Sequence, residues 1–241
     1  MKKTMRLDKL LAAAGYGSRK EIKSMVREGL VSVNGSPVND SALHVATEGD
    51  SVTVNGSPVS FREFIYLMLN KPAGCVSATF DNRDNTVLEL VPENYRHYEL
   101  FPVGRLDKDT EGLLLLTNDG KLAHELLAPK KHVPKTYFVR VDKMVEDQHL
   151  KHLAKGVILD DGYKTKPAVA KLLAAGPPGE VALTIVEGKF HQVKRMFKAL
   201  GMNVIYLQRT AMGRVPLDPA LSLGMMRELT PEELKEFKKT L

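Results

Sequence analysis

The order of strand-like and helix-like segments after residue 60 restricts the fold of this chain more than any other feature. Strand patterns occur at 64–69, 113–116, 136–141, 157–159, 168–173, 181–186 and 204–208, and helical patterns at 121–127, 146–155, 191–200 and 231–240. These helices do not alternate regularly with the strands, as βαβ units of a parallel sheet would require. We therefore expect an α+β fold with a mixed, mostly antiparallel sheet.

The first 60 residues show a different pattern. Leucines at helical spacing predict a helix over 6–14 that Gly15 ends, and Ser18 with Glu21 forms a capping box that starts a second helix. Valines then alternate around Asn34-Gly35, and again around Asn55-Gly56, as in β-hairpins with two-residue turns. We expect a small helix–helix–hairpin module.

The length agrees with two unequal domains. At roughly 150 residues per domain, a chain of 241 residues is longer than a typical single domain. A linker near 56–63 separates the two patterns, so we predict one domain over residues 1–60 and a second over residues 61–241.

The positive charge is concentrated at the N-terminus. The net charge is +6, and the first 30 residues alone hold eight basic and three acidic side chains. Four of the basic ones follow the second predicted helix: Arg19, Lys20, Lys23 and Arg27. They form either a solvated helical surface or a face that contacts phosphates, and the small number of acidic residues nearby favours the second interpretation.

Several classes of protein are disfavoured. A single cysteine, Cys75, forms neither an internal disulfide nor a cysteine-rich zinc site. We find no signal peptide, no apolar stretch of ~20 residues that could span a bilayer, and no phosphate-binding, dinucleotide or serine-hydrolase motif. We therefore expect a cytoplasmic protein without a membrane partner.

Two segments carry most of the chemically useful residues. In the first, Asp107, Asp109 and Glu111 precede an apolar strand, which suits a catalytic carboxylate but also describes a hydrated acidic loop. In the second, His191 and Lys194 share a basic helix start with Arg195 and Lys198. This segment is either a basic surface, a phosphate clamp or the source of a cation beside the carboxylate.

The sequence motifs resemble those of the pseudouridine synthases. Gly104-Arg105-Leu106-Asp107, followed by the segment 110–120, is similar to the catalytic motif of that family. Three further segments fit the family in the same order: 69–72, 135–137 and 191–197. The N-terminal module, with Arg6 and Ser18-Arg19, resembles the alpha-L RNA-binding domain that precedes this catalytic domain.

The resemblance implies a role for each matching residue. Asp107 corresponds to the essential aspartate, Tyr137 to the aromatic residue against the target base, and Arg105 to the arginine that places the flipped nucleotide. Lys194 corresponds to the cation that pairs with the aspartate, and Arg195 beside it is the alternative. The remaining substrate-binding candidates are Leu207, Lys71, His191 and Gln192 of the motifs and Arg6, Arg19, Lys20, Lys23 and Arg27 of the N-terminal module.

The resemblance also implies the substrate. Its details are similar to the RsuA-type enzymes of the small ribosomal subunit, which implies isomerisation of the uridine at position 516 of 16S rRNA in an assembly intermediate. The isomerisation involves no net redox change, so we expect no cofactor and no metal, and we expect a monomer.

Three alternatives remain open. They are a 23S rRNA enzyme of the same family, a non-enzymatic RNA-binding assembly factor, and a metal-dependent nuclease that uses Asp107, Asp109 and Glu111. A carboxylate within a phosphate-facing basic surface repels RNA, so a pure binding protein has no use for it. The enzyme is therefore the preferred hypothesis.

Overall fold

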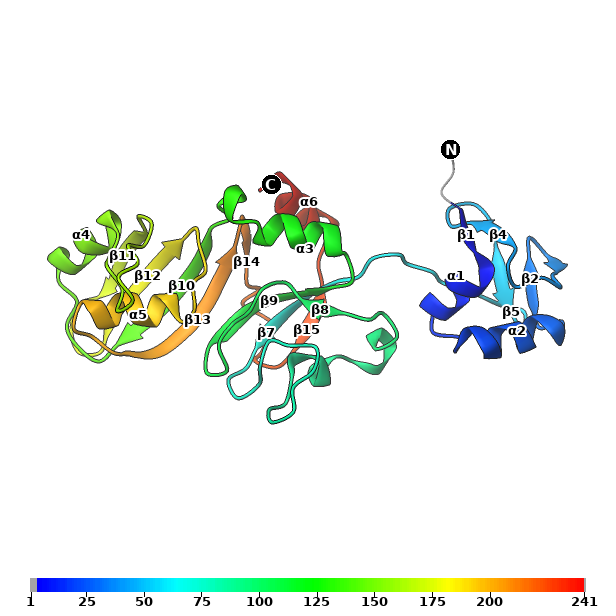
Figure 1. The fold of residues 1–241 in the computed structure, drawn as a ribbon, viewed down its shortest axis with the longest axis horizontal. Coiled ribbons are helices and arrows are strands. Elements are labelled where there is room, and N and C mark those ends of the chain that lie inside the picture. Colours follow the sequence, from blue (N-terminus) through cyan, green and yellow to red (C-terminus); the bar gives the residue numbers. More distant parts are fainter. Residues whose placement is uncertain (1–3, 241) are drawn as a thin grey trace. The chain divides into compact units, whose positions relative to one another are not determined.

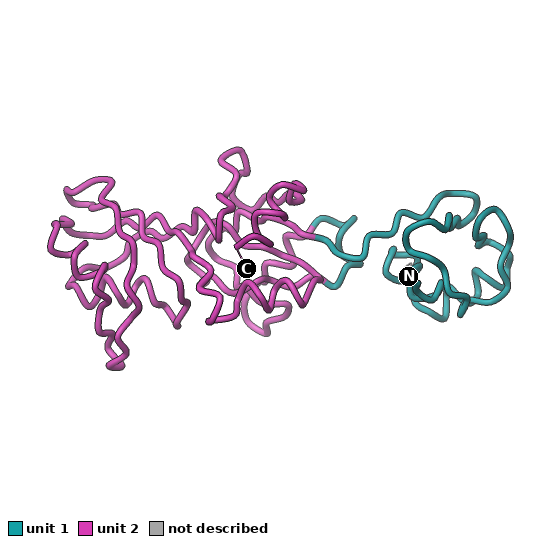
Figure 2. The backbone as a smooth tube through the Cα atoms, turned by 90° about the horizontal axis from the view of Figure 1, so that it is seen from above, with its two compact units in different colours: residues 1–65, 92–99 teal, residues 66–91, 100–241 magenta. Residues whose placement is uncertain are grey.

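The computed structural model describes residues 4–240 and divides the chain into two compact units (Figure 2). Unit 1 comprises Met1–Ile65 and Pro92–Glu99, and unit 2 comprises Tyr66–Val91 and Leu100–Leu241. Lys2 and Lys3, which contribute to the N-terminal charge, lie outside the described residues. Each unit is built around its own apolar core, as expected of separate domains.

Unit 1 contains two helices, α1 (Leu7–Ala13) and α2 (Arg19–Arg27). The predicted capping box at the start of α2 is confirmed, because the Glu21 N–H donates to Ser18 Oγ and Glu21 Oε2 accepts from the Ser18 N–H. Leucines of α1 and the buried Ile22 and Val26 of α2 form one core. β1 (Thr4–Arg6) and β4 (His44–Ala46) pair into a two-stranded antiparallel sheet, which the sequence did not predict.

Both predicted hairpins of unit 1 form. β2 (Val31–Val33) pairs with β3 (Ser36–Pro37), and β5 (Val52–Val54) pairs with β6 (Ser57–Pro58). Asn34 and Gly35 of the first turn have φ of 52° and 80°, the left-handed backbone that an Asn-Gly turn provides. The two hairpins pair through β2 and β5 into one four-stranded sheet.

Unit 2 is built on a nine-stranded sheet. Seven of its strands follow the order β11-β12-β10-β13-β9-β7-β15, and the short strands β14 and β8 pair with β13 and β9. The strands are β7 (Tyr66–Lys71), β8 (Phe101–Pro102), β9 (Glu111–Thr117), β10 (Lys135–Val141), β11 (Val169–Ala174), β12 (Gly179–Ile185), β13 (Val204–Met212), β14 (Val215–Pro216) and β15 (Met226–Glu228). The helices are α3 (Gly120–Leu127), α4 (Asp147–Lys155), α5 (Gln192–Ala199) and α6 (Pro231–Lys239), with short 3-10 turns at Val87–Leu90 and Pro129–Lys131.

The pairing confirms the expected fold class. All neighbouring strands are antiparallel except β9 and β13, which run parallel. Gly112 makes this parallel contact possible, because a Cβ atom at its position would lie 2.3 Å from the Arg209 carbonyl oxygen. The sheet is therefore mixed and mostly antiparallel, and its one parallel junction follows the acidic loop directly.

Helices cover the sheet around β9. α3 and α6 contribute Leu122 and Phe237 to a core with Leu113 and Leu115 of β9, and α5 packs against β13 (Figure 1). Because Leu113–Leu116 are all buried, β9 is covered on both faces and holds the preceding loop rigidly.

The expected strand at 157–159 is wrong. That segment has one isolated antiparallel bridge, between Ile158 and Lys164, and the Thr165 N–H donates to the Val157 carbonyl at 2.9 Å. No helix within residues 4–240 combines the length and the apolar character needed to cross a membrane.

Candidate active site

Asp107 lies in the loop between β8 and β9, and this loop is anchored from the opposite side by the segment after β7. The Leu106 N–H donates to Ser77 Oγ at 3.0 Å, and Ser77 Oγ lies 3.0 Å from the Leu106 carbonyl. The Gly74 N–H donates to the Lys108 carbonyl at 2.7 Å. The backbone on both sides of Asp107 is therefore fixed before any substrate binds.

Lys71, expected from the sequence to bind substrate, lies beneath this loop instead. It is 0% exposed, and its Nζ donates to the carbonyls of Pro72, Asp107 and Thr110 at 3.0, 3.1 and 2.9 Å. Burial lowers the pKa of Lys71. A fully covered ammonium cannot reach a ligand, so Lys71 holds the Asp107 loop through the carbonyl groups of that loop.

The carboxylate of Asp107 has two cationic or ionisable neighbours from the segment that starts α5. Lys194 Nζ lies 3.2 Å from Asp107 Oδ2, and His191 Nε2 lies 3.6 Å from Asp107 Oδ1. Lys194 also contacts Asp109 Oδ1 at 2.5 Å. The side chain of Asp107 is 27% exposed, so the carboxylate is held at the surface where a substrate can reach it.

Lys194 is held in its charged form. Burial acts to lower its pKa, but the hydrogen bond to Asp109 and the charge of Asp107 outweigh it, so the pKa of Lys194 is raised. For Asp109, burial acts to raise the pKa, and the hydrogen bond from Lys194 reverses that effect and lowers it. One ammonium between two carboxylates fixes the direction of the Asp107 side chain.

Arg195, the alternative partner in the sequence analysis, faces elsewhere. Its guanidinium pairs with Asp160, and with Asp161 at 2.7 Å.

We expect Lys194→Met to lower kcat/KM for RNA modification by about 10²–10³-fold, because the carboxylate loses its fixed counter-charge. Arg195→Met is the matched control and should cost less than about tenfold. Equal losses in the two variants, measured by single-turnover kinetics, would contradict the assignment.

Gln192 is also structural in this arrangement. It is buried, donates from Nε2 to Glu187 Oε1 at 2.7 Å, and accepts the Lys189 N–H at 2.9 Å. The sequence predicted a substrate contact, whereas the amide group closes the turn that precedes α5. Gln192 therefore positions His191 and Lys194.

Tyr137 and Leu207 lie on neighbouring strands. Leu207 is opposite Val139 and Tyr137 is opposite Arg209 across the β10–β13 pair, and all four side chains are buried. Arg209 Nε donates to the Leu113 carbonyl at 2.7 Å, which links this pair to β9. The roles of Tyr137 and Leu207 toward the base stay predictions.

Arg105 differs from these residues. Its side chain is exposed, and the part of the chain that the structure describes gives it no hydrogen bond or ion pair. It is available to a ligand, and its role in placing the nucleotide also stays a prediction.

Lys135 is a partly buried cation two residues before Tyr137, and the sequence did not predict its burial. Burial, and then the charge of Arg209, lower the pKa of Lys135 to about 8. Between pH 8 and 10.5 the folded protein has released this proton and the unfolded chain has not, so the free energy of unfolding should rise with pH there. Below pH 8 both states are protonated and the burial cost is fully present.

We expect Lys135→Met to be more stable than wild type at pH 7 by about 2 kcal/mol, after loss of the hydrogen bond to Val133 is allowed for. The difference should shrink as the pH rises above 8 and reach zero before pH 10.5. Urea unfolding of both proteins at a series of pH values measures it, and a difference independent of pH would contradict the burial of a charged Lys135.

The three acidic residues of the nuclease alternative do not share one site. Glu111 Oε2 accepts the Tyr206 hydroxyl at 2.7 Å, and burial together with Glu111 raises the pKa of Tyr206 to about 12. Asp107 and Asp109 share the Lys194 ammonium. Within residues 4–240 no three potential metal ligands gather, and this geometry gives the nuclease alternative no support.

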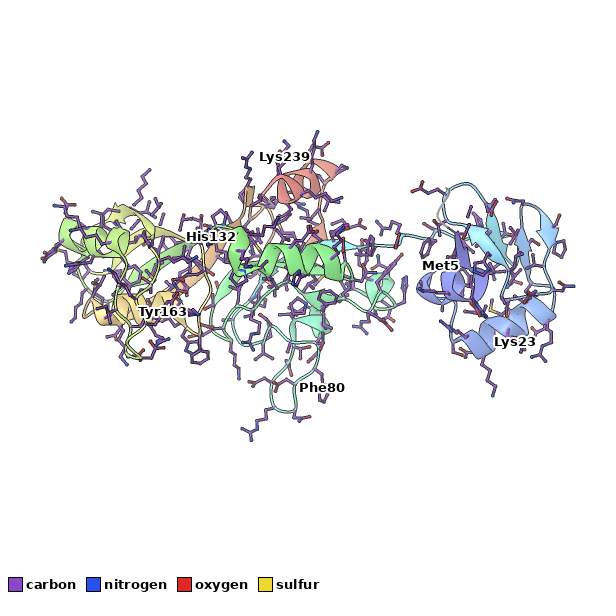
Figure 3. The ribbon with its side chains drawn as sticks, turned by 45° about the horizontal axis from the view of Figure 1, so that its top comes forward. Met5, Lys23, Phe80, His132, Tyr163 and Lys239 are labelled. Atoms are coloured by element: carbon purple, nitrogen blue, oxygen red, sulfur yellow. The ribbon has the colours of Figure 1, made fainter. Side chains whose placement is uncertain are left out.

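The basic residues of α2 are exposed in unit 1, and Lys23 lies on the outer side of that helix (Figure 3). Arg6 is different, because its guanidinium donates to Asp8 at 3.1 and 2.6 Å and lowers the pKa of that carboxyl. The exposed face for an anionic ligand is thus carried by Arg19, Lys20, Lys23 and Arg27.

Fold and site together define an enzyme: a carboxylate held by a lysine at the start of a buried strand, on a mixed sheet, with an exposed basic helix, α2, in a separate unit. Residues 65–199 match the RNA pseudouridylate synthase family, and residues 5–52 match the S4 domain. The chain belongs to the RNA pseudouridine synthase family, which makes it an RNA isomerase.

Relatives match over almost the full chain. An uncharacterised RNA pseudouridine synthase of Bacillus subtilis is 56% identical over 95% of this chain and 97% of its own. The ribosomal large subunit pseudouridine synthase B of Bacillus subtilis is 41% identical (97% and 95% covered), and the ribosomal small subunit pseudouridine synthase A of Escherichia coli is 40% identical (95% and 98% covered). A crystal structure of a pseudouridylate synthase superimposes with a TM-score of 0.67 at 36% identity, covering 97% of this chain and 99% of that one.

Proposed function

We propose that this protein converts the uridine at position 516 of 16S rRNA to pseudouridine, in the cytoplasm, as a monomer acting on an assembly intermediate of the small subunit. The N1–C1′ bond of the uridine breaks, the uracil turns, and a C5–C1′ bond forms. C5 loses its proton and N1 gains one, so the atoms balance without a cofactor or metal. The observation that carries the chemical step of this proposal is the Asp107–Lys194 pair at 3.2 Å.

The residues of the site divide the work. Asp107 acts as the ionised carboxylate, by attack or by stabilising positive charge at the sugar, and Lys194 fixes its direction. A stacked base is out of reach, so the nucleotide flips out at a cost of a few kcal/mol. Stacking on Tyr137 returns about 1–3 kcal/mol, Leu207 covers the base, and Arg105 holds the flipped nucleotide.

The choice of 16S rRNA rests on sequence motifs. Overall identity does not decide it, because the large-subunit and small-subunit relatives are 41% and 40% identical. The Phe190-His191-Gln192 segment and Lys135-Thr136 resemble the small-subunit enzymes. The 41% identity to a large-subunit enzyme makes a uridine of 23S rRNA the second candidate.

The test uses purified protein and RNA fragments labelled with tritium at uridine C5. Tritium release from the 16S fragment, with pseudouridine mapped at position 516, is the expected result. Release from a 23S fragment alone would keep the family and overturn the substrate.

The basic face of α2 is proposed to bind RNA phosphates without sequence preference. Changing Lys20, Lys23 and Arg27 to Gln should weaken RNA binding, and the slope of log K against log salt should fall by about 0.7 for each single-strand phosphate that is no longer neutralised. The single-turnover rate at saturating RNA should stay within about twofold, because Asp107 lies in the other unit. An unchanged salt slope, measured by RNA binding between about 50 and 200 mM salt, would count against this role.

A further inference from the structure

We propose that Phe190 and His191 form a stacking platform at the rim of the active site, and that it binds the base of a nucleotide next to the target uridine. The inference rests on the proposed function and adds to it a second base-binding position. None of the residue roles described above includes Phe190.

The two rings form a preassembled surface. Their centroids lie 3.8 Å apart with an interplanar angle of 17°, and Phe190 is nevertheless 74% exposed. One face of the Phe190 ring is therefore covered by His191 while the other is open to solvent. An aromatic ring fixed in this way is suited to stack on a nucleobase, since every base presents a π-face of similar size.

The backbone that carries the platform is rigid. His191 has a φ of 48°, an uncommon left-handed conformation for a residue with a side chain. It persists because the adjacent turn is fixed on both sides: Gln192 holds Glu187, and Glu187 accepts the Tyr163 hydroxyl at 2.8 Å. Tyr163 comes from the loop after α4 (Figure 3), so two segments hold the platform in place.

The platform borders a groove with a cavity volume of about 710 Å³. Its lining includes Lys194, Arg195 and Lys198, but also Asp160 and Asp161, which pair with Arg195. Opposite charges nearly balance in this groove, so electrostatic attraction for RNA is weak there. The open face of the Phe190 ring therefore contributes more to RNA binding than the charges of the groove do. Lys198 is available to contact a phosphate.

Position distinguishes a neighbouring base from the target uracil. His191 Nε2 is 3.6 Å from Asp107 Oδ1, so the platform lies beside the carboxylate. Tyr137, 8% exposed, is the deep aromatic residue already proposed for the target base. The exposed Phe190 ring at the rim is therefore placed to stack on the base of a nucleotide that adjoins the target uridine in the RNA strand.

The test measures binding and position together. An RNA fragment carrying 2-aminopurine directly 5′ or 3′ of the target uridine is titrated with the full-length protein, and fluorescence is read with Kd. We expect quenching at one of the two positions. We expect Phe190→Ala to remove this quenching and raise Kd by about tenfold.

Three variants separate stacking from other effects. Phe190→Trp should keep Kd within about twofold, and Phe190→Leu should behave like Phe190→Ala, because it restores apolar bulk without a π-face. Val169→Ala is the control, since this side chain is 73% exposed on the edge strand β11. An unchanged Kd in Phe190→Ala, or full rescue by Leu, would overturn the proposal.

A separate activity assay on the same RNA fragments distinguishes failure of the stacking platform from failure of the proposed function. Pseudouridine formation by the wild type reports whether the fragment is a substrate, independently of the fluorescence. If the wild type converts a 23S fragment instead, the platform is measured on that RNA with the same variants and the same expected results.

Discussion

Replacing Asp107 by Asn is expected to lower the rate of pseudouridine formation by at least about 10⁴-fold, while RNA affinity stays within about threefold. The amide has nearly the same shape but carries no charge, so it cannot attack carbon or stabilise a cationic sugar. The side chain lies outside the apolar core and is 27% exposed, so the fold should tolerate the change. Single-turnover tritium release and filter binding give the two quantities.

Asp109→Asn is the matched control. Asp109 shares Lys194 with Asp107 but is 72% exposed, and its loss should cost less than about tenfold. Normal turnover by Asp107→Asn would remove this residue from the chemistry, and a larger defect in Asp109→Asn would move the essential carboxylate by two positions.

Lys71→Met is expected to reduce the free energy of unfolding by about 1–3 kcal/mol and to slow the chemical step as well. Methionine fills a similar volume but donates no hydrogen bond, so the carbonyls of Asp107 and Thr110 lose a buried donor. Loss of these bonds frees the loop that carries the Asp107 carboxylate. Urea unfolding and single-turnover kinetics at saturating RNA measure the two effects.

Lys108→Met is the control for this change. Lys108 lies on the same loop, but its ammonium is exposed and pairs with Asp84 at 2.5 Å, so we expect a loss below about 1 kcal/mol. If Lys71→Met unfolded at the same urea concentration as the wild type, the buried lysine would not support the loop.

Local signals account for the elements that the sequence predicted. The Asn-Gly turns, the Ser18–Glu21 capping box and the apolar run of β9 each act within a few residues, and each forms as expected. β14 and β15 escaped prediction because such short strands exist through their partners β13 and β7. The parallel contact of β9 and β13 depends equally on residues about 100 positions apart.

In the site, too, local sequence signals predicted some features, and contacts between distant segments determine the others. The motifs predicted the pairing of Asp107 with Lys194, but sequence alone did not separate Lys194 from Arg195. Adjacent residues on a helix point about 100° apart, so one reaches Asp107 and the other reaches Asp160. Lys71 and Gln192 were expected at the substrate because both belong to segments that match the family motifs. Burial under the loop and within the turn is a tertiary property that no local pattern records.

The measurement that tests the proposed function most directly is chemical mapping of pseudouridine in rRNA from cells with and without this gene. We predict that the signal at position 516 of 16S rRNA disappears in the deletion strain, returns with the wild-type gene and does not return with Asp107→Asn. A signal at position 516 that persists in the deletion strain would contradict this function.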